Sequence, residues 1–256
     1  MTDVLMDRAD GVLTLTLNRV EKKNAFTQAM YTAMADALVD AADDAAIRVV
    51  VIQGHATVFS AGNDLRDFLS GSALGASGQA PVQRFISVLA AFPKPLLAAV
   101  CGPAVGIGTT MLFHCDLVYA GDNAAFSMPF VNLGLCPEAA SSLLAPRLMG
   151  YQRAAQALLM GEPFMAEAAL EVGLVNRIVP PTEANALAHA QARKLAAKPL
   201  PSLIETKRLL KKDQADAVAQ RIGEEFDSFG RMLNEPAARE AIAAFTEKRR
   251  PDFSRL

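Results

Sequence analysis

Two short glycine-bearing loops are the features of this sequence whose residue types and spacing suit a chemical role. They are Phe59-Ser60-Ala61-Gly62-Asn63-Asp64-Leu65 and Gly102-Pro103-Ala104-Val105-Gly106-Ile107-Gly108. Each loop follows an apolar, β-branched run and precedes a stretch of helical character, so both are predicted to be strand-to-helix turns. Two such turns can direct backbone N–H groups at one point, where the positive end of a helix helps to stabilise an oxyanion. The loops therefore predict a carbonyl substrate that reacts through an enolate or a tetrahedral oxyanion.

Other combinations of reactive side chains give weaker signals. The chain contains three histidines, His55, His114 and His189. Their spacing from Cys, Asp and Glu is not ligand-like, so we predict neither a metal site nor a Ser-His-Asp arrangement. The run Gly106–Met111 lacks the third glycine of a dinucleotide-binding fingerprint. Asp64 is expected to cap a short helix after the first loop, and Asp116 to be a structural carboxylate.

Strands and helices alternate before about residue 183, which predicts an α/β fold. Apolar runs predict strands at Val12–Leu17, Arg48–Ile52, Leu96–Val100 and Leu117–Ala120. Helices are expected from a Thr27 cap to about Asp44, over Val82–Ala91, and from the second glycine loop to His114. The Gly- and Ser-rich stretch Ser70–Pro81 is expected to be a loop inside the domain.

Strand signals stop after about Glu183. Helices are then expected over residues 183–197, 201–211, 214–233 and 236–248. Apolar side chains such as Phe226, Phe229 and Phe245 predict that this tail packs on the core or on another subunit.

The composition restricts the class of protein. The chain has 256 residues, is 52% hydrophobic and carries a formal charge of −2. This charge balance argues against a nucleic-acid partner or an anionic membrane partner. Three cysteines in apolar contexts, without CxxC spacing, are expected to be reduced thiols in a reducing compartment.

No membrane span or secretory signal is predicted. The segment Leu96–Phe113 has no charged residue, but Gly102-Pro103, Gly106 and Gly108 interrupt it. A buried strand, a turn and a buried helix account for it better. The N-terminus lacks signal-peptide character, so a cytoplasmic protein is expected. The final Ser254-Arg255-Leu256 leaves a peroxisomal address as the lesser alternative.

The chain resembles the enoyl-CoA hydratase/isomerase (crotonase) superfamily over essentially its whole length. The matching segments, in order, are Leu17-Asn18-Arg19, Lys23-Asn24-Ala25, the first glycine loop, Pro93-Lys94-Pro95, the second glycine loop, Cys115-Asp116 and Gly173-Leu174-Val175. The resemblance implies a spiral of ββα units over residues 1–195. It also implies a C-terminal helical region, residues 196–256, that mediates formation of a homotrimer or a hexamer.

The resemblance further implies that the backbone N–H groups of Asn63 and Ile107 bind the carbonyl oxygen of an acyl-CoA thioester. Coenzyme A is then part of the substrate, and no separate cofactor is expected. The substrate-binding residues carried over are Lys22, Lys23, Ala25, Ser60, Ala61, Gly62, Asn63, Asp64, Leu65 and Gly106. Arg19 joins the two early lysines as a candidate for the phosphates, and Lys207 and Lys211 are weaker candidates for a neighbouring subunit's ligand.

The reaction is inferred from three positions. Where hydratases of the superfamily carry two glutamates, this chain has Thr110 and Phe130. The segment Leu133-Gly134-Leu135-Cys136-Pro137-Glu138 instead resembles the Δ3-Δ2-enoyl-CoA isomerase branch, in which the glutamate corresponding to Glu138 is the base. One carboxylate with a pKa raised by an apolar pocket can remove a proton from C2 and return it to C4. The prediction is therefore an enoyl-CoA isomerase.

Two alternatives remain open at this point. One is an enoyl-CoA hydratase, or another enolate-forming member of the superfamily, that uses a base not yet identified. The other is a catalytically silent acyl-CoA-binding protein.

Overall fold

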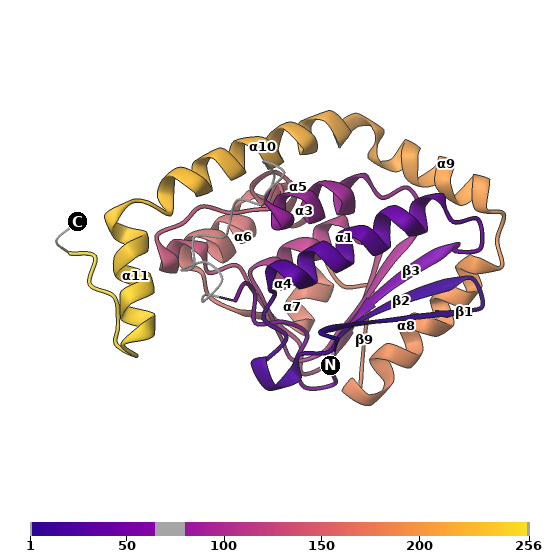
Figure 1. Cartoon of the computed structure of the whole chain (residues 1–256), viewed down its shortest axis with the longest axis horizontal. Helices are drawn as coiled ribbons and strands as arrows, with labels where there is room; N and C mark the ends of the chain where they lie inside the picture. Colours follow the sequence, from indigo (N-terminus) through magenta and orange to yellow (C-terminus); the bar gives the residue numbers. More distant parts are fainter. Residues whose placement is uncertain (1, 65–79, 255–256) are drawn as a thin grey trace.

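The computed structural model describes residues 2–64 and 80–254 of an α/β protein (Figure 1). Its larger sheet has the strand order β1-β2-β3-β4-β6-β9. These strands are β1 (Val4–Ala9), β2 (Val12–Leu17), β3 (Val49–Gln53), β4 (Leu96–Val100), β6 (Leu117–Gly121) and β9 (Arg177–Val179). β1 pairs antiparallel with β2, and every other pairing in this sheet is parallel.

A smaller sheet has the order β5-β7-β8, with β5 (Pro103–Val105), β7 (Ala125–Ser127) and β8 (Phe164–Met165). β5 is parallel to β7, and β7 is antiparallel to β8. β4 and β6 belong to the large sheet, whereas the strands that follow them, β5 and β7, belong to the small one. The chain thus passes repeatedly from one sheet to the other, and the second glycine loop lies at one of these passages.

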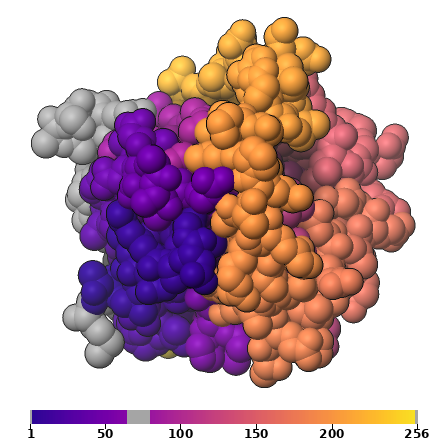
Figure 2. Space-filling view, turned by 90° about the vertical axis from the view of Figure 1, so that its right-hand side faces the viewer, coloured from indigo at the N-terminus to yellow at the C-terminus, as the bar shows by residue number. Residues whose placement is uncertain are grey.

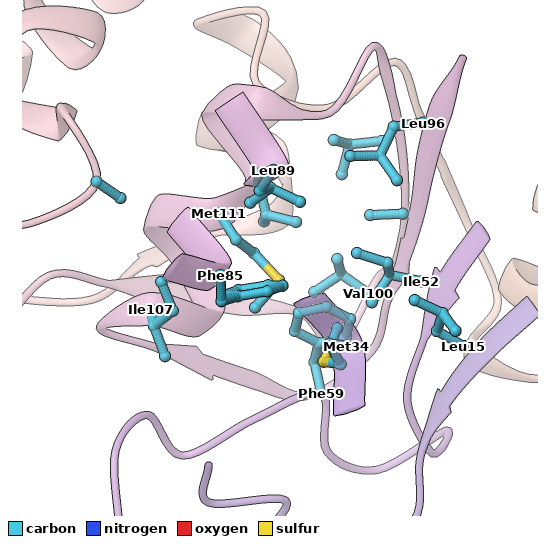
Figure 3. Packing of buried hydrophobic residues seen from close by; sticks show 14 of the residues in the cluster. Leu15, Met34, Ile52, Phe59, Phe85, Leu89, Leu96, Val100, Ile107 and Met111 are labelled. Atoms are coloured by element: carbon cyan, nitrogen blue, oxygen red, sulfur yellow. The ribbon is translucent and has the colours of Figure 1, made fainter. Parts of the chain in front are cut away.

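Helices cover both faces of the large sheet. α1 (Gln28–Asp43) and α3 (Pro81–Ala91) cover one face, where Leu15, Ile52 and Val100 pack among residues of the main core (Figure 3). α8 (Pro181–Ala196) covers the other face, where its alanines meet Val49, Val51 and Leu97. Central strands buried on both faces account for the continuous apolar runs of β3 and β4.

Side chains fix both ends of α1. Thr27 Oγ1 accepts a hydrogen bond from the Met30 amide at 3.3 Å, as the sequence predicts for an N-cap. At the other end, the buried Lys94 Nζ donates to the carbonyls of Ala41, Asp44 and Ile47 at 2.6, 2.8 and 2.9 Å. A cation at this end satisfies carbonyls that the helix leaves without partners.

The C-terminal tail crosses the molecule as α9 (Leu200–Lys211), α10 (Ala215–Met232) and α11 (Pro236–Thr246), and α11 stands at one end (Figure 1). From the side, α8 and α9 border the N-terminal strands (orange beside indigo in Figure 2). Lys207 of α9 is 6% exposed and donates to Asp116 Oδ2 at 2.7 Å and to the Lys94 carbonyl at 2.8 Å. Asp116 is thus a structural carboxylate, and Lys207 is not available to a ligand.

The remaining helices build the region around the small sheet. They are α4 (Ile107–Thr110), α5 (Ser141–Met149), α6 (Tyr151–Ala155) and α7 (Ala166–Glu171), with 3₁₀ turns at Met111–His114 and Phe130–Leu133 and a π-helical turn at Gln156–Met160. Two further 3₁₀ turns lie elsewhere, at Val20–Lys22 in the early part of the chain and at Lys212–Gln214 between α9 and α10. Across the part of the chain described, no helix combines the length and the apolar character that crossing a membrane requires.

Most of the predicted elements are confirmed. The four predicted strands correspond to β2, β3, β4 and β6, and the four tail helices to α8–α11. The sequence reasoning missed β1, β5, β7, β8 and β9. Leu65, the expected short helix after Asp64 and most of the Ser70–Pro81 loop lie outside the described residues.

Candidate active site

Backbone pairing holds the two glycine loops against each other. The Val105 amide donates to the Ser60 carbonyl at 2.9 Å, and the Ser60 amide donates to the Pro103 carbonyl at 3.0 Å. A Cβ placed on Gly106 would lie 4.0 Å from the Gly62 Cα. Asn63 and Ile107 each follow one of these adjacent glycines, so the pairing brings together the two residues that the sequence analysis singled out.

The pairing of Asn63 with Phe26 orients the Asn63 amide. The Phe26 amide donates to the Gly62 carbonyl at 2.8 Å, and the Asp64 amide donates to the Phe26 carbonyl at 2.9 Å. In this parallel bridge, the neighbours of Asn63 make the hydrogen bonds, and the N–H of Asn63 itself points away from Phe26. The geometry thus leaves this N–H without an acceptor in the bridge, on the side away from Phe26.

The Ile107 amide stands at the start of α4. The Gly106 carbonyl accepts from the Thr109 and Thr110 amides at 2.9 Å each, which closes the first helical turn. An N–H at the first helical position has no acceptor within its helix. Gly106 has a φ of +55°, a conformation that glycine adopts without steric strain, and this turn aims the following amide.

An early loop, residues 19–25, packs against the first glycine loop. The Ala61 amide donates to the Lys23 carbonyl at 2.9 Å, and the fully buried Asn24 donates to the Phe59 carbonyl at 3.0 Å. Arg19 forms a half-buried ion pair with Asp64 at 2.8 Å. Arg19 therefore holds the loops together, and Asp64 contributes to this bridge.

Two neighbouring cavities, which share several lining residues, open beside these loops. One, of about 580 Å³, is lined by nearly all of the predicted substrate-binding residues within the described part of the chain: Lys22, Lys23, Ala25, Ala61, Gly62, Asn63, Asp64 and Gly106. The other, of about 870 Å³, lies between α3, α10 and α11 and is lined by Val82, Phe226, Phe229 and Ala243 among others. Asn63 and Glu138 line both cavities. A ligand that filled both would pass directly by these two residues.

Two of the predicted residues do not line either cavity. Ser60 is fully buried beneath the loops, where its Oγ donates to the Asn24 carbonyl at 2.9 Å and accepts from the Gly62 amide at 3.1 Å. Ser60 therefore stabilises the backbone of the two loops through these hydrogen bonds, and its side chain is not exposed to either cavity. The side chain of Ile107 is also fully buried, so its contribution is limited to its backbone.

Glu138 is a buried carboxylate. It is 6% exposed, and its Oε1 has no hydrogen-bond partner among the described residues. Burial, assisted by the charge of Glu225, raises the pKa of Glu138 from 4.5 to about 8. A carboxylate with these properties is suited to exchange a proton near neutral pH.

The turn that carries Glu138 has an unusual backbone. Ala139 and Ala140 have φ values of +59° and +55°, which alanine rarely adopts. Contacts on two sides hold the turn: His114 Nε2 lies 2.8 Å from the Ala139 carbonyl, and the Ala140 amide donates to Glu225 Oε2 at 2.6 Å. His114, which burial keeps neutral by lowering its pKa to about 4, is thus a structural histidine.

Sequence reasoning missed two residues of the site. Tyr31 of α1 is buried, and its hydroxyl donates to Asn63 Oδ1; burial raises the pKa of Tyr31 well above 10. Glu225 of α10 reaches the Glu138 turn. Both residues are distant in sequence from the motifs and belong to ordinary amphipathic helices, so no local signal distinguishes them.

The two positions that the sequence resemblance matched to hydratase glutamates are buried here. Phe130 is 5% exposed and lines the smaller cavity, and Thr110 is fully buried. Lys211 donates to the His114 carbonyl at 3.1 Å, and Lys207 is bound to Asp116, so both tail lysines have contacts within the core. Within residues 2–64 and 80–254, no three His, Cys, Asp or Glu side chains gather as metal ligands.

Comparison with known proteins gives matches along nearly the whole chain. The family described as enoyl-CoA hydratase/isomerase matches residues 7–255. The chain is 34% identical over 253 residues to the 2,3-dehydroadipyl-CoA hydratase of Escherichia coli K12, covering 99% of both chains. It is also 34% identical over 250 residues to the enoyl-CoA delta isomerase 2 of Rattus norvegicus, covering 96% of this chain and 64% of that protein.

Solved structures agree with these sequence matches. A crystal structure of an enoyl-CoA hydratase/isomerase from Pseudoalteromonas atlantica T6c superposes with a TM-score of 0.93 at 38% identity. This similarity covers 98% of this chain and 100% of the other.

Proposed function

Because the chain belongs to the enoyl-CoA hydratase/isomerase family, we propose that it is an enoyl-CoA isomerase, which moves the double bond of a 3-enoyl-CoA to C2. The substrate is an acyl-CoA thioester, and coenzyme A serves as its carrier with no separate cofactor. The protein acts in the cytoplasm as a homotrimer or hexamer.

Glu138 is the proton carrier of the proposed reaction. Its carboxylate removes a proton from C2, and the electrons move through the C2–C1 unit onto the thioester oxygen to give a dienolate. The amides of Asn63 and Ile107 donate to that oxygen, a contact that strengthens as negative charge develops there. The protonated Glu138 then returns the proton to C4, and the double bond forms between C2 and C3.

The observation that carries this proposal is the position of Glu138. Among the described residues it is the carboxylate that lines both cavities, and one of its oxygens is buried without a partner. Syn addition of water uses two carboxylates in the family's hydratases, and Thr110 and Phe130 occupy those positions here. A single acid–base group is sufficient for a proton shuttle between two carbons on one face of the acyl chain.

The remaining parts of the cavities suit the two ends of an acyl-CoA. Lys22 and Lys23 are exposed on the rim of the smaller cavity, where they can pair with phosphates. The larger cavity, lined by apolar side chains from α3, α10 and α11 together with polar ones, is assigned to the acyl chain.

The test is Glu138→Gln, assayed with a 3-enoyl-CoA. Removing the base is expected to lower kcat by about 10³-fold, within the range of general acid–base catalysis, while a saturated acyl-CoA binds with nearly unchanged affinity. Glu183→Gln, an exposed carboxylate at the start of α8, is the matched control and should keep full activity. Full activity of Glu138→Gln would remove this residue from the mechanism.

The second candidate is hydration, which the 34% identity to a 2,3-dehydroadipyl-CoA hydratase favours. Incubation with a 2-enoyl-CoA distinguishes the two, because a hydratase forms the 3-hydroxy product and an isomerase does not. Tight acyl-CoA binding without turnover of any enoyl-CoA would indicate a silent binding protein instead.

A further inference from the structure

The proposed mechanism does not use Glu225, a buried carboxylate next to the catalytic turn. Glu225 belongs to α10, in the C-terminal region, and is 5% exposed. It lines the larger cavity together with Glu138. A charged side chain is rarely buried unless its interactions offset the loss of hydration.

Both oxygens of Glu225 accept hydrogen bonds from the segment that follows Glu138. Oε2 accepts from the Ala140 amide at 2.6 Å, and Oε1 accepts from the Ser142 amide at 3.0 Å and the Ser142 hydroxyl at 2.5 Å. Arg221 Nη1 donates to the Ser142 Oγ at 3.0 Å, so the hydroxyl hydrogen is left for Glu225. The two backbone amides can only donate, so Glu225 must accept from them, which favours its ionised form.

These contacts lie at a turn whose backbone conformation is strained. Two successive alanines with positive φ, Ala139 and Ala140, carry backbone strain, which persists only where the surroundings determine the conformation. Glu225 holds one side of this turn, and His114 holds the other through the Ala139 carbonyl. The direction of the Glu138 side chain depends on the same turn.

We infer that Glu225 is a positioning residue for Glu138: its ionised carboxylate fixes the turn that aims Glu138 at the substrate and places a negative charge beside it. The inference rests on the proposed function of Glu138. It means that the C-terminal region takes part in building the catalytic site in addition to any role in assembly.

Electrostatics around Glu138 agree with this role. Burial contributes most to its raised pKa, and the charge of Glu225 adds to it. Burial also raises the pKa of Glu225, but the hydrogen bonds from Ser142 and Ala140 and the charge of Arg221 oppose that shift. The two carboxylates differ in that backbone N–H groups stabilise the ionised form of Glu225, whereas Oε1 of Glu138 has no such donor among the described residues.

The other titratable groups that face this pair do not replace Glu225. Tyr31 of α1 is a buried neutral phenol, and Cys136 precedes the turn with a thiol pKa that burial raises. His114 contacts the turn as a neutral imidazole, and Arg221 reaches it through the Ser142 hydroxyl. Among these described groups, Glu225 is the one that supplies negative charge.

The first test is Glu225→Gln in the full-length protein, assayed with a 3-enoyl-CoA across pH. The amide lacks the charge and places an N–H opposite a backbone N–H, so kcat is expected to fall by about 10- to 100-fold with KM little changed. Because Glu138 acts as a base, kcat/KM rises with pH through its pKa. Loss of the neighbouring charge is expected to move this rise to lower pH.

Two further variants separate the effect of the Glu225 charge from that of its side-chain length and of the net charge of the helix. Glu225→Asp keeps the charge but is one methylene shorter, so we expect kcat to fall while the midpoint of the pH profile stays close to that of the wild type. This variant also carries the test if Glu225→Gln does not fold. Asp216→Asn, an exposed carboxylate on the same helix, is the control for net charge and should leave kcat and the midpoint unchanged. An unchanged kcat in both Glu225 variants, or an unmoved midpoint in Glu225→Gln, would overturn the inference.

A substrate-free measurement separates this inference from the isomerase proposal. The Glu138 carboxyl can be titrated by NMR in protein labelled with [13C]glutamate, with its signal assigned by its loss in Glu138→Gln. A lower titration midpoint in Glu225→Gln supports the coupling even if no 3-enoyl-CoA is turned over. An identical midpoint in Glu225→Gln and the wild type would contradict it whatever the reaction is.

Discussion

At the scale of single residues, the burial that suits Glu138 to catalysis also opposes folding. An ionised carboxylate in an apolar site has lost much of its hydration, and Oε1 of Glu138 has no described partner to replace it. In the folded protein the proton is therefore held up to a pKa of about 8. In the unfolded chain it is released near 4.5. This difference links the candidate base to the stability of the whole protein.

The linkage predicts that Glu138→Gln is stabilising at high pH. Between pH 4.5 and about 8 the folded state binds more protons at Glu138 than the unfolded state, so the wild-type free energy of unfolding falls relative to the variant as pH rises. The expected slope is about 1.4 kcal/mol per pH unit, an upper estimate for so buried a group. Urea denaturation of both proteins at pH 5, 6.5 and 8 measures it.

The comparison between the two proteins removes the effect of His114. Its pKa of about 4 makes the fold more stable as pH rises towards 6.5, in the opposite sense to Glu138, but this contribution is common to wild type and variant. A difference between the two proteins that stays constant with pH would mean that Glu138 titrates normally in the folded state.

Tyr31 provides a second prediction at this scale. Its hydroxyl holds the Asn63 side chain, so Tyr31→Phe should loosen the residue that supplies the first amide donor. We expect kcat/KM to fall by about tenfold, because small displacements of a positioned group reduce the rate strongly. The control is Thr32→Val, which removes an exposed hydroxyl from the same helix. Equal activity of Tyr31→Phe and wild type would show that the hydroxyl does not position the loop.

At the scale of elements, the two glycine loops depend on close backbone contact. Gly62 has a φ of +87°, and a Cβ there would lie 3.0 Å from the Val105 carbonyl oxygen. Val105 immediately precedes Gly106, so a displacement at Gly62 is transmitted to the second loop. The positions of both proposed amide donors therefore require that residue 62 has no side chain.

This dependence predicts the effect of Gly62→Ala. The substitution is expected to lower kcat by about 10²-fold or more, the magnitude found when an oxyanion donor is lost. Gly150→Ala is a matched control, because Gly150 also has a positive φ of +78° but nothing within 4 Å of an added Cβ. Both variants should lose about 1 kcal/mol of stability from the backbone conformation. Comparable activity in the two variants would contradict the role of the loops.

Sequence patterns predicted the elements that are long and buried. β3 and β4 are continuous apolar runs because both of their faces are covered, and α1 has a cap and a regular apolar face. β1 escaped prediction because five of its six residues are exposed and its polar Asp7 and Arg8 break the pattern. β5, β7, β8 and β9 have two or three residues, too few to display a period.

The candidate site was predictable only where it follows a local motif. The glycine loops and Glu138 stand in recognisable segments, whereas Glu225 resembles any other glutamate of an amphipathic helix. Its role depends on the packing of α10 across the turn of Glu138, which is a long-range contact. The cavity-lining function of α11 is likewise a property of the folded chain.

At the scale of the whole molecule, the site draws on both predicted regions of the chain. Phe229, Leu233 and Ile242, all from the C-terminal helices, line both cavities together with residues of the N-terminal core. The sequence division at residue 195 therefore separates segments that jointly enclose the candidate site. Assembly and catalysis are expected to be connected through α10 and α11.

The last prediction concerns assembly. The segment from α6 through the π-helical turn to β8 exposes several large apolar side chains, and its colour range is that of the pink margin on the right of Figure 2. Their exposed fractions are 70% for Tyr151, 68% for Leu159, 56% for Met160 and 48% for Met165. Apolar surface gathered in this way is typical of a protein interface, so we expect the segment to contact another copy in the proposed homotrimer or hexamer.

Charges placed in this segment test the expectation. In the variant that combines Leu159→Glu with Met160→Glu, two charges would have to be buried without partners, which should dissociate the oligomer. Sedimentation velocity at micromolar concentration measures this, with Val39→Glu on α1, at 40% exposure, as the control. A double variant that keeps the oligomeric mass of the wild type would mean that the interface lies elsewhere. A monomeric wild type would mean that no such interface forms.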